Sequence, residues 1–93
     1  NLNQNLAERE ISKQLIRSGM SVGANTSSAF RGRSSKEYKS KLGVVIEEAD
    51  ECIYWMDLLI ASGANVDSNL VKKLQVEANE LVSIFISLVK KSD

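Results

Sequence analysis

Four acidic residues close together are the side chains best suited to chemistry in this sequence: Glu47, Glu48, Asp50 and Glu51. Glu47 and Glu51 stand four positions apart, a spacing that puts both carboxylates on one face of a helix. Dinuclear metal sites in helical bundles combine such carboxylates with Glu-x-x-His motifs on facing helices, and this chain contains no histidine. We therefore expect no metal site, and we interpret the acidic residues as partners for cationic side chains on another subunit.

The absence of histidine also bears on catalysis. The chain lacks the commonest general base and cannot form a Ser-His-Asp or Cys-His arrangement. The single cysteine, Cys52, falls on a predicted apolar stripe, and we interpret it as a small buried hydrophobe rather than a reactive thiol. We expect a protein that is not an enzyme and that has no cofactor. A lone cysteine also suits a reducing cytoplasm, since small secreted domains usually rely on several disulfides.

Basic residues gather in one short stretch, where Glu37 is the one acid between positions 31 and 41. Lysine and arginine side chains so placed can contact the phosphates of a nucleic acid, and we predict such a surface here, the basic corner. The alternative stays open that these charges simply solvate a corner between two helices. Tyr38, the single aromatic residue in the stretch, is expected in the core, so no base-stacking surface is predicted. The candidate nucleic-acid-binding residues are Arg31, Arg33, Lys36, Lys39 and Lys41, with Arg17 as a further member.

Length, charge and hydropathy limit the classes of protein that remain. The chain has 93 residues, which suits one domain with one core. Its 12 basic and 12 acidic residues cancel, so attraction to nucleic acid or to a membrane surface needs a local patch. No apolar run approaches the roughly 20 residues needed to span a bilayer, and we expect no membrane association.

The periodicity of the apolar residues predicts three helices, over about residues 6–30, 35–62 and 68–91, in an all-α domain that spans residues 1–93. The short links between them predict an antiparallel, up-down helical bundle. Ser34 followed by Glu37 forms a capping-box pattern for the second helix. Gly63 suits the end of that helix, and Asp67 or Ser68 suits the cap of the third.

Two apolar stripes at helical spacing define most of the predicted core. The stripe of the second helix has a further apolar line beside it, which predicts two neighbouring helices for that element. The second helix is expected to bury Tyr38, Leu42, Val45, Ala49, Cys52, Met56 and Leu59. The third helix is expected to bury Leu70, Leu74, Ala78, Leu81, Phe85 and Leu88, with Val71, Ile84 and Val89 widening this stripe.

Five residues are candidates for packing between helices or subunits. Gly19 and Gly23 lie four apart, so another helix backbone can approach that face closely. Asn25 is expected to fix helix register through its hydrogen bonds. Trp55, beside Tyr54, lies off the main stripe, and core and subunit interface are equally open to it. Because three helices leave one apolar face of the second helix uncovered, we expect a homo-oligomer.

Five short segments occur in a fixed order along the chain: SVGAN at 21–25, RSSKEY at 33–38, EADE at 48–51, YWMDLL at 54–59 and EANEL at 77–81. None of them is chemically specific alone. As an ordered set they resemble the four-helix-bundle family of 23S rRNA intervening-sequence proteins, over nearly the whole chain from about Gln14 to Leu88.

That resemblance implies an antiparallel four-helix bundle that assembles into a bacterial homopentamer. Family members have an additional N-terminal helix before the segment matched here, so we expect the first helix of the bundle to be missing from this chain. Bundles of similar fold serve diversity-generating retroelements as accessory proteins that engage nucleic acid, which implies that the basic corner is RNA-associated. The alternative is a protein-protein interaction scaffold with no nucleic-acid contact, which the zero net charge favours.

Overall fold

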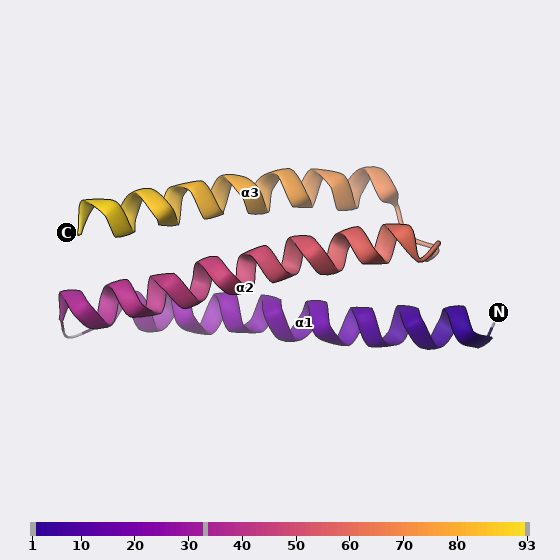
Figure 1. The fold of residues 1–93 in the computed structure, drawn as a ribbon, viewed down its shortest axis with the longest axis horizontal. Helices are drawn as coiled ribbons and strands as arrows, with labels where there is room; N and C mark the ends of the chain where they lie inside the picture. The colour runs from indigo at the N-terminus through magenta and orange to yellow at the C-terminus, as the bar shows by residue number, and fades with distance from the viewer. Residues whose placement is uncertain (1, 33, 93) are drawn as a thin grey trace.

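The computed structural model describes residues 2–32 and 34–92, with side chains from residue 6 onward. Three long helices make up most of this part of the chain (Figure 1). Helix α1 comprises Leu2–Phe30, α2 comprises Ser35–Ala61 and α3 comprises Ser68–Lys91. The predicted all-α class is confirmed, and α1 begins a few residues earlier than its periodicity predicts. Over the residues described, none of these helices combines the length and hydropathy needed to cross a membrane.

The links between the helices carry the expected local signals. Ser34 precedes α2, and its hydroxyl oxygen accepts a hydrogen bond of 3.1 Å from the backbone N–H of Glu37. Asp67 caps α3, where its carboxylate accepts from two N–H groups of the first turn at 3.1 and 3.2 Å. Gly63 follows α2 with a positive φ of 77°, a conformation that favours glycine. These caps and this turn fix where α2 ends and where α2 and α3 begin.

The helices lie side by side in a single layer with α2 in the middle (Figure 1). Both α1 and α3 pack against α2, whereas among the described residues no Cα atom of α1 lies within 8 Å of a Cα atom of α3. Helices α1 and α3 run in one direction and α2 runs in the other, which confirms the up-down arrangement. The principal extents of 50 × 20 × 14 Å reflect this flat layer. No described helix covers the face of α2 between α1 and α3.

The largest buried cluster lies where the start of α2 meets the ends of the other two helices. Ala29 of α1 and Phe85 of α3 pack there against the middle helix. The residues that α2 buries are Leu42, Val45, Ala49, Met56 and Leu59. All five belong to the stripe predicted for α2, and its other two members, Tyr38 and Cys52, are half-buried.

The core prediction for α3 is confirmed at Phe85 and Val71 and is wrong at three of the six residues of its stripe. Leu70, Leu74 and Leu81 are 53, 44 and 48% exposed. The residues that α3 buries are Val71, Val82 and Phe85. The leucines and the valines occupy neighbouring lines of one wide apolar face, about 100° apart around the helix axis. Helix α3 turns the valine line toward α2, so the leucine line has no described neighbour to cover it.

Candidate nucleic-acid interface

The end of the molecule that holds the link between α1 and α2 carries most of the predicted basic corner. Arg31 and Lys36 are exposed there, and Lys39 and Lys41 are half-buried in the first two turns of α2. Arg33 lies outside the described residues. The described cations of the corner therefore lie together at one end of the helical layer.

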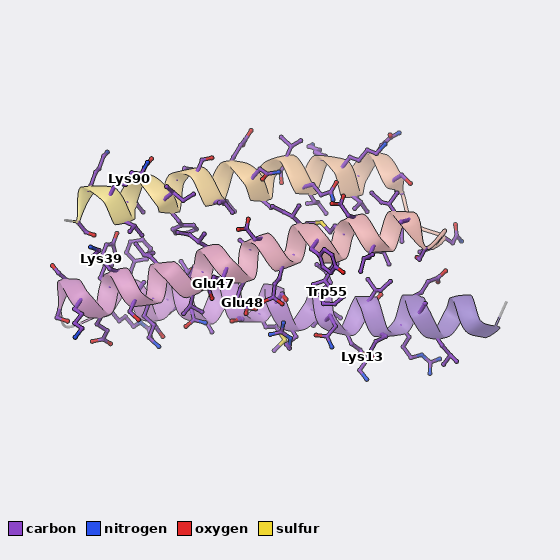
Figure 2. The ribbon with its side chains drawn as sticks, viewed as in Figure 1. Lys13, Lys39, Glu47, Glu48, Trp55 and Lys90 are labelled. Carbon is purple, nitrogen blue, oxygen red and sulfur yellow. The ribbon has the colours of Figure 1, made fainter. Side chains whose placement is uncertain are left out.

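Two lysines that the predicted corner does not include, Lys90 and Lys91, lie in the last turn of α3 at the same end. Figure 2 shows Lys39 and Lys90 at this end, one on α2 and the other on α3. Their distance in the sequence hides the grouping, although an up-down bundle places the end of its third helix beside the start of its second. We name the whole group the basic end: Arg31, Lys36, Lys39, Lys41, Lys90 and Lys91.

An aromatic pair also lies at the basic end. Phe30, the last residue of α1, contacts Tyr38 of α2 edge to face, with ring centroids 5.9 Å apart and ring planes at 60°. Tyr38 packs against the buried core residues, whereas Phe30 is 63% exposed. Sequence reasoning missed Phe30 because it stands one position before the basic stretch and because its exposure depends on how the helices pack.

Arg17 does not join the basic end. It stands 13 residues before Phe30, the last residue of α1, which is about 20 Å at 1.5 Å per residue. Its guanidinium instead reaches α2, where Nη1 lies 3.4 Å from Oε2 of Glu48 and Nη2 lies 3.1 Å from Oε1 of Glu51. Nη2 also donates a hydrogen bond of 3.2 Å to Oγ of the fully buried Ser18. The expected place of Arg17 beside the basic corner is therefore wrong, because one continuous helix separates them.

Two of the four acidic residues clustered at positions 47–51 of α2 thus have a cationic partner inside the chain. This corrects the expectation of a partner on another subunit for Glu48 and Glu51, whereas Glu47 and Asp50 are exposed. Burial raises the pKa of the Glu48 carboxyl, Glu51 raises it further, and Arg17 acts in the opposite direction. Among the described residues, no group of three or more acidic or cysteine side chains is placed to hold a metal ion.

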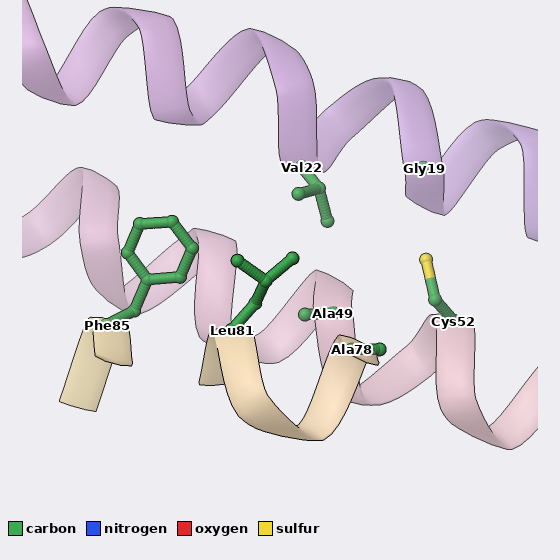
Figure 3. Close-up of a pocket in the computed structure, with 7 residues that line it drawn as sticks. All are labelled: Gly19, Val22, Ala49, Cys52, Ala78, Leu81 and Phe85. Carbon is green, nitrogen blue, oxygen red and sulfur yellow. The ribbon is translucent and has the colours of Figure 1, made fainter. Parts of the chain in front are cut away.

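A groove of about 130 Å³ lies over α2, between α1 and α3 (Figure 3). Its lining is apolar and is formed by Gly19, Val22, Ala49, Cys52, Ala78, Leu81 and Phe85. Outside the backbone of α1 itself, no described atom lies within 4 Å of the position that a Cβ would take on Gly19 or Gly23. The close helix contact predicted at these glycines is not made within the described chain, and it stays a prediction about another helix.

The thiol of Cys52 points into this groove, toward α1 (Figure 3). The residue is half-buried, so it is less enclosed than the predicted core position. Burial raises the pKa of the thiol, and the negative charges of Glu48 and Glu51 raise it further. Because the thiolate is the nucleophile, a thiol held in its protonated form suits packing better than reaction.

The remaining packing candidates lie on α1 and α2. Asn25 donates from Nδ2 to the backbone oxygen of Ser21 at 2.9 Å and to its Oγ at 3.1 Å, so these hydrogen bonds stay within α1. Tyr54 and Trp55 form an edge-to-face pair with ring centroids 5.0 Å apart. Tyr54 is 55% exposed, whereas Trp55 is half-buried and its Nε1–H has no acceptor among the described residues. Of this pair, Trp55 packs inward and Tyr54 faces solvent.

Comparison with known proteins gives two findings. A family model described as 23S rRNA-intervening sequence protein matches residues 1–87 of this chain. A crystal structure from Bacteroides thetaiotaomicron, of a protein with unknown function from the S23 ribosomal protein family, is similar with a TM-score of 0.79 and 32% sequence identity. That similarity covers 86% of this chain and 70% of the Bacteroides chain. No curated protein matches significantly.

Proposed function

This chain belongs to the family of 23S rRNA-intervening sequence proteins, and on that basis we propose that it is a non-enzymatic, RNA-associated protein that binds phosphates through its basic end. The supporting observation is the convergence of three helix termini, which gathers cationic side chains from distant parts of a chain with no net charge. Such a local patch attracts a polyanion even when the whole molecule is neutral, because charges interact appreciably only within about 10 Å in 0.1 M salt.

Contact with phosphates determines how the affinity for RNA depends on salt and on RNA sequence. Each lysine or arginine that neutralises a phosphate releases condensed counterions, so affinity falls with salt in proportion to the number of contacts. Phosphate contacts position a nucleic acid without reading its sequence. The basic end is therefore expected to bind RNAs of different sequence with similar affinity and with a steep dependence on salt.

A charge-reversal experiment tests this proposal. We expect Arg31→Glu with Lys90→Glu to weaken RNA binding and to reduce the slope of log affinity against log salt by about 0.7 to 0.9 per lost contact. The matched control is Lys72→Glu with Lys73→Glu, which makes the same charge change at the opposite end of α3. Equal losses in both variants, or no loss in the first, would show that the basic end is not the RNA surface.

We also propose that a fourth helix of the family fold fills the groove and completes a four-helix bundle. Support comes from the groove itself, from the exposed leucine line of α3 beside it and from the open space at Gly19. The similar Bacteroides chain is longer than the matched part, since this chain covers 70% of it. A helix in the groove, antiparallel to α1 and α3, would bury apolar surface that the described helices leave open.

Cys52 reports directly on that proposal because its thiol points into the groove. We expect a maleimide to label Cys52 in the 93-residue chain and to label it much more slowly in a form that carries the fourth helix. Protection that rises with protein concentration would instead identify a second copy as the occupant. Equal labelling of both forms at all concentrations would show that the groove stays open.

We propose in addition that the bundle assembles in the cytoplasm as a homo-oligomer, a pentamer by family resemblance. Exposed apolar side chains outside the groove support assembly, among them Ile16 and Met20 on α1, which are 61 and 70% exposed. Light scattering of the purified protein measures the molar mass of the assembly and therefore the number of chains in it.

The rival function is a scaffold that recruits another protein, and a protein partner retained after nuclease treatment would favour that function.

A further inference from the structure

The basic end carries an exposed aromatic ring that phosphate binding does not use. Phe30 is 63% exposed, although a phenylalanine ring gains free energy from burial. We propose that the basic end binds RNA with an unpaired base, and that this base stacks on the ring of Phe30. The inference rests on the RNA association proposed above and names the class of RNA that the basic end takes.

The position of Phe30 is well defined. Its ring meets Tyr38 edge to face at 5.9 Å between centroids, and Tyr38 packs in turn against the buried cluster of the core. The pair therefore joins the last residue of α1 to the first turn of α2. A ring held from one side by an anchored neighbour, and open on the rest of its surface, is a suitable platform for a base.

Each ring of this platform has a cation close after it in the sequence. Arg31 follows Phe30 directly and is exposed, and Lys41 lies one helical turn after Tyr38. Proteins that bind single-stranded nucleic acid combine such charges, which track the phosphates, with aromatic rings on which bases stack. The structure thus places an exposed aromatic ring beside the basic residues, whereas Tyr38, the aromatic residue within the basic stretch, packs against the core.

Stacking of this kind selects among RNAs by structure. In a perfect A-form duplex every base is already stacked, and its deep, narrow major groove excludes side chains. Loops, bulges and single strands present bases that can be splayed out onto an aromatic ring. The basic end is therefore expected to prefer single-stranded or looped RNA to a duplex with the same number of phosphates.

Substitution of Phe30 separates stacking from packing. Phe30→Leu keeps an apolar side chain but removes the aromatic face, and Phe30→Tyr keeps the ring. We expect Phe30→Leu to weaken binding of a single-stranded RNA by about 5- to 150-fold, to leave binding of a fully paired, blunt-ended RNA duplex unchanged, and to preserve the salt slope. Phe30→Tyr should retain the affinity of the unmodified protein for both RNAs.

Tyr54→Leu is the matched control because Tyr54 is also exposed and aromatic but lies far along α2 from the basic end. It should change neither affinity. Thermal unfolding of each variant shows that the fold is intact. If Phe30→Leu binds the single strand as tightly as the unmodified protein, or weakens both RNAs equally, base stacking is refuted while salt-dependent RNA binding can stand. If the unmodified protein binds no RNA at low salt, both proposals fall.

Discussion

Single residues decide how α1 is joined to α2. One guanidinium, that of Arg17, serves the two carboxylates of Glu48 and Glu51, so a negative charge stays uncompensated when both are ionised. The Glu48 side chain is 15% exposed and that of Glu51 is 42% exposed, so ionisation is more costly at Glu48. This is why burial raises the pKa of Glu48 in spite of its cationic neighbour.

A prediction about pH follows from Glu48. Its pKa is higher in the folded chain than the ordinary 4.5, so the folded state binds this proton more readily than the unfolded state. The group therefore favours folding most at low pH, and this contribution is lost as the pH rises from about 4.5 through the raised pKa. We predict that Glu48→Gln flattens this dependence and keeps or raises the free energy of unfolding at pH 7, measured by urea unfolding across the pH range.

The exposed neighbour Glu47 supplies the control for this change. Glu47→Gln removes the same charge from the same helix but not the contact with Arg17, so the comparison separates the effect of Glu48 from the loss of one negative charge on α2. A loss at pH 7 for Glu48→Gln greater than the about 1 kcal/mol of an exposed ion pair would contradict the prediction. It would mean that attraction between Arg17 and Glu48 outweighs the cost of burying the carboxylate.

The candidate site shows which residue properties can be predicted from a sequence. The cations near Arg31 are adjacent in the chain, so their grouping is visible from the residue order alone. Phe30 and Lys90 join them only through packing, because exposure and the meeting of distant helix ends depend on tertiary contacts. The ion pairs of Arg17 cannot be predicted for a related reason. Its partners, Glu48 and Glu51, lie on another helix, and only the packing of the two helices brings them within reach.

At the scale of whole elements, α3 shows which structural features the periodicity of apolar residues predicts and which it does not. Its apolar residues occupy two neighbouring lines, and both repeat at helical spacing. The pattern therefore locates the helix correctly but does not tell which line meets α2. The packing against α2 buries Val71 and Val82 and leaves Leu70 and Leu74 exposed. In α2 the buried line agrees with the prediction, because its stripe is longer and neighbours on both sides cover it.

The N-cap of α3 gives a prediction at this scale. Helix α3 packs against α2 alone among the described helices, so its start depends on Asp67, which accepts hydrogen bonds from two backbone N–H groups. We predict that Asp67→Ala lowers the free energy of unfolding by about 1 kcal/mol, measured by urea unfolding. Asp67→Ser, which keeps a capping oxygen, should retain most of the stability. An equal loss in both variants would show that the cap oxygen does not matter.

The whole molecule is a flat layer with two distinct surfaces. One end gathers cations from all three helix termini, and a groove lined with apolar residues opens over α2. Because α1 and α3 do not approach each other, neither can close the groove for the other. The arrangement leaves room for one more helix, which would contact α1 and α3 along the leucine line and the two glycines.

Gly19 gives a prediction for the complete bundle. A Cβ at this position has no atom of another described helix within 4 Å, so we expect Gly19→Leu to preserve the free energy of unfolding of the 93-residue protein or to raise it by up to about 1 kcal/mol through helix propensity. A helix packed closely over Gly19 reverses the sign, because the leucine then overfills the contact and costs about 1–3 kcal/mol. The same variant should restore maleimide labelling of Cys52 in a form that carries the fourth helix.

Gly43 provides the comparison that makes this result specific. It is also a helical glycine with open space around its Cβ position. It lies two residues before the buried Val45, so the two positions are about 200° apart around the axis of α2, and Gly43 faces away from that buried residue. Gly43→Leu should raise or preserve stability in both forms of the protein, since no fourth helix reaches it. If Gly19→Leu behaves in the same way in the longer form, no helix packs against α1 at the groove, and the leucine line of α3 must be covered by something else.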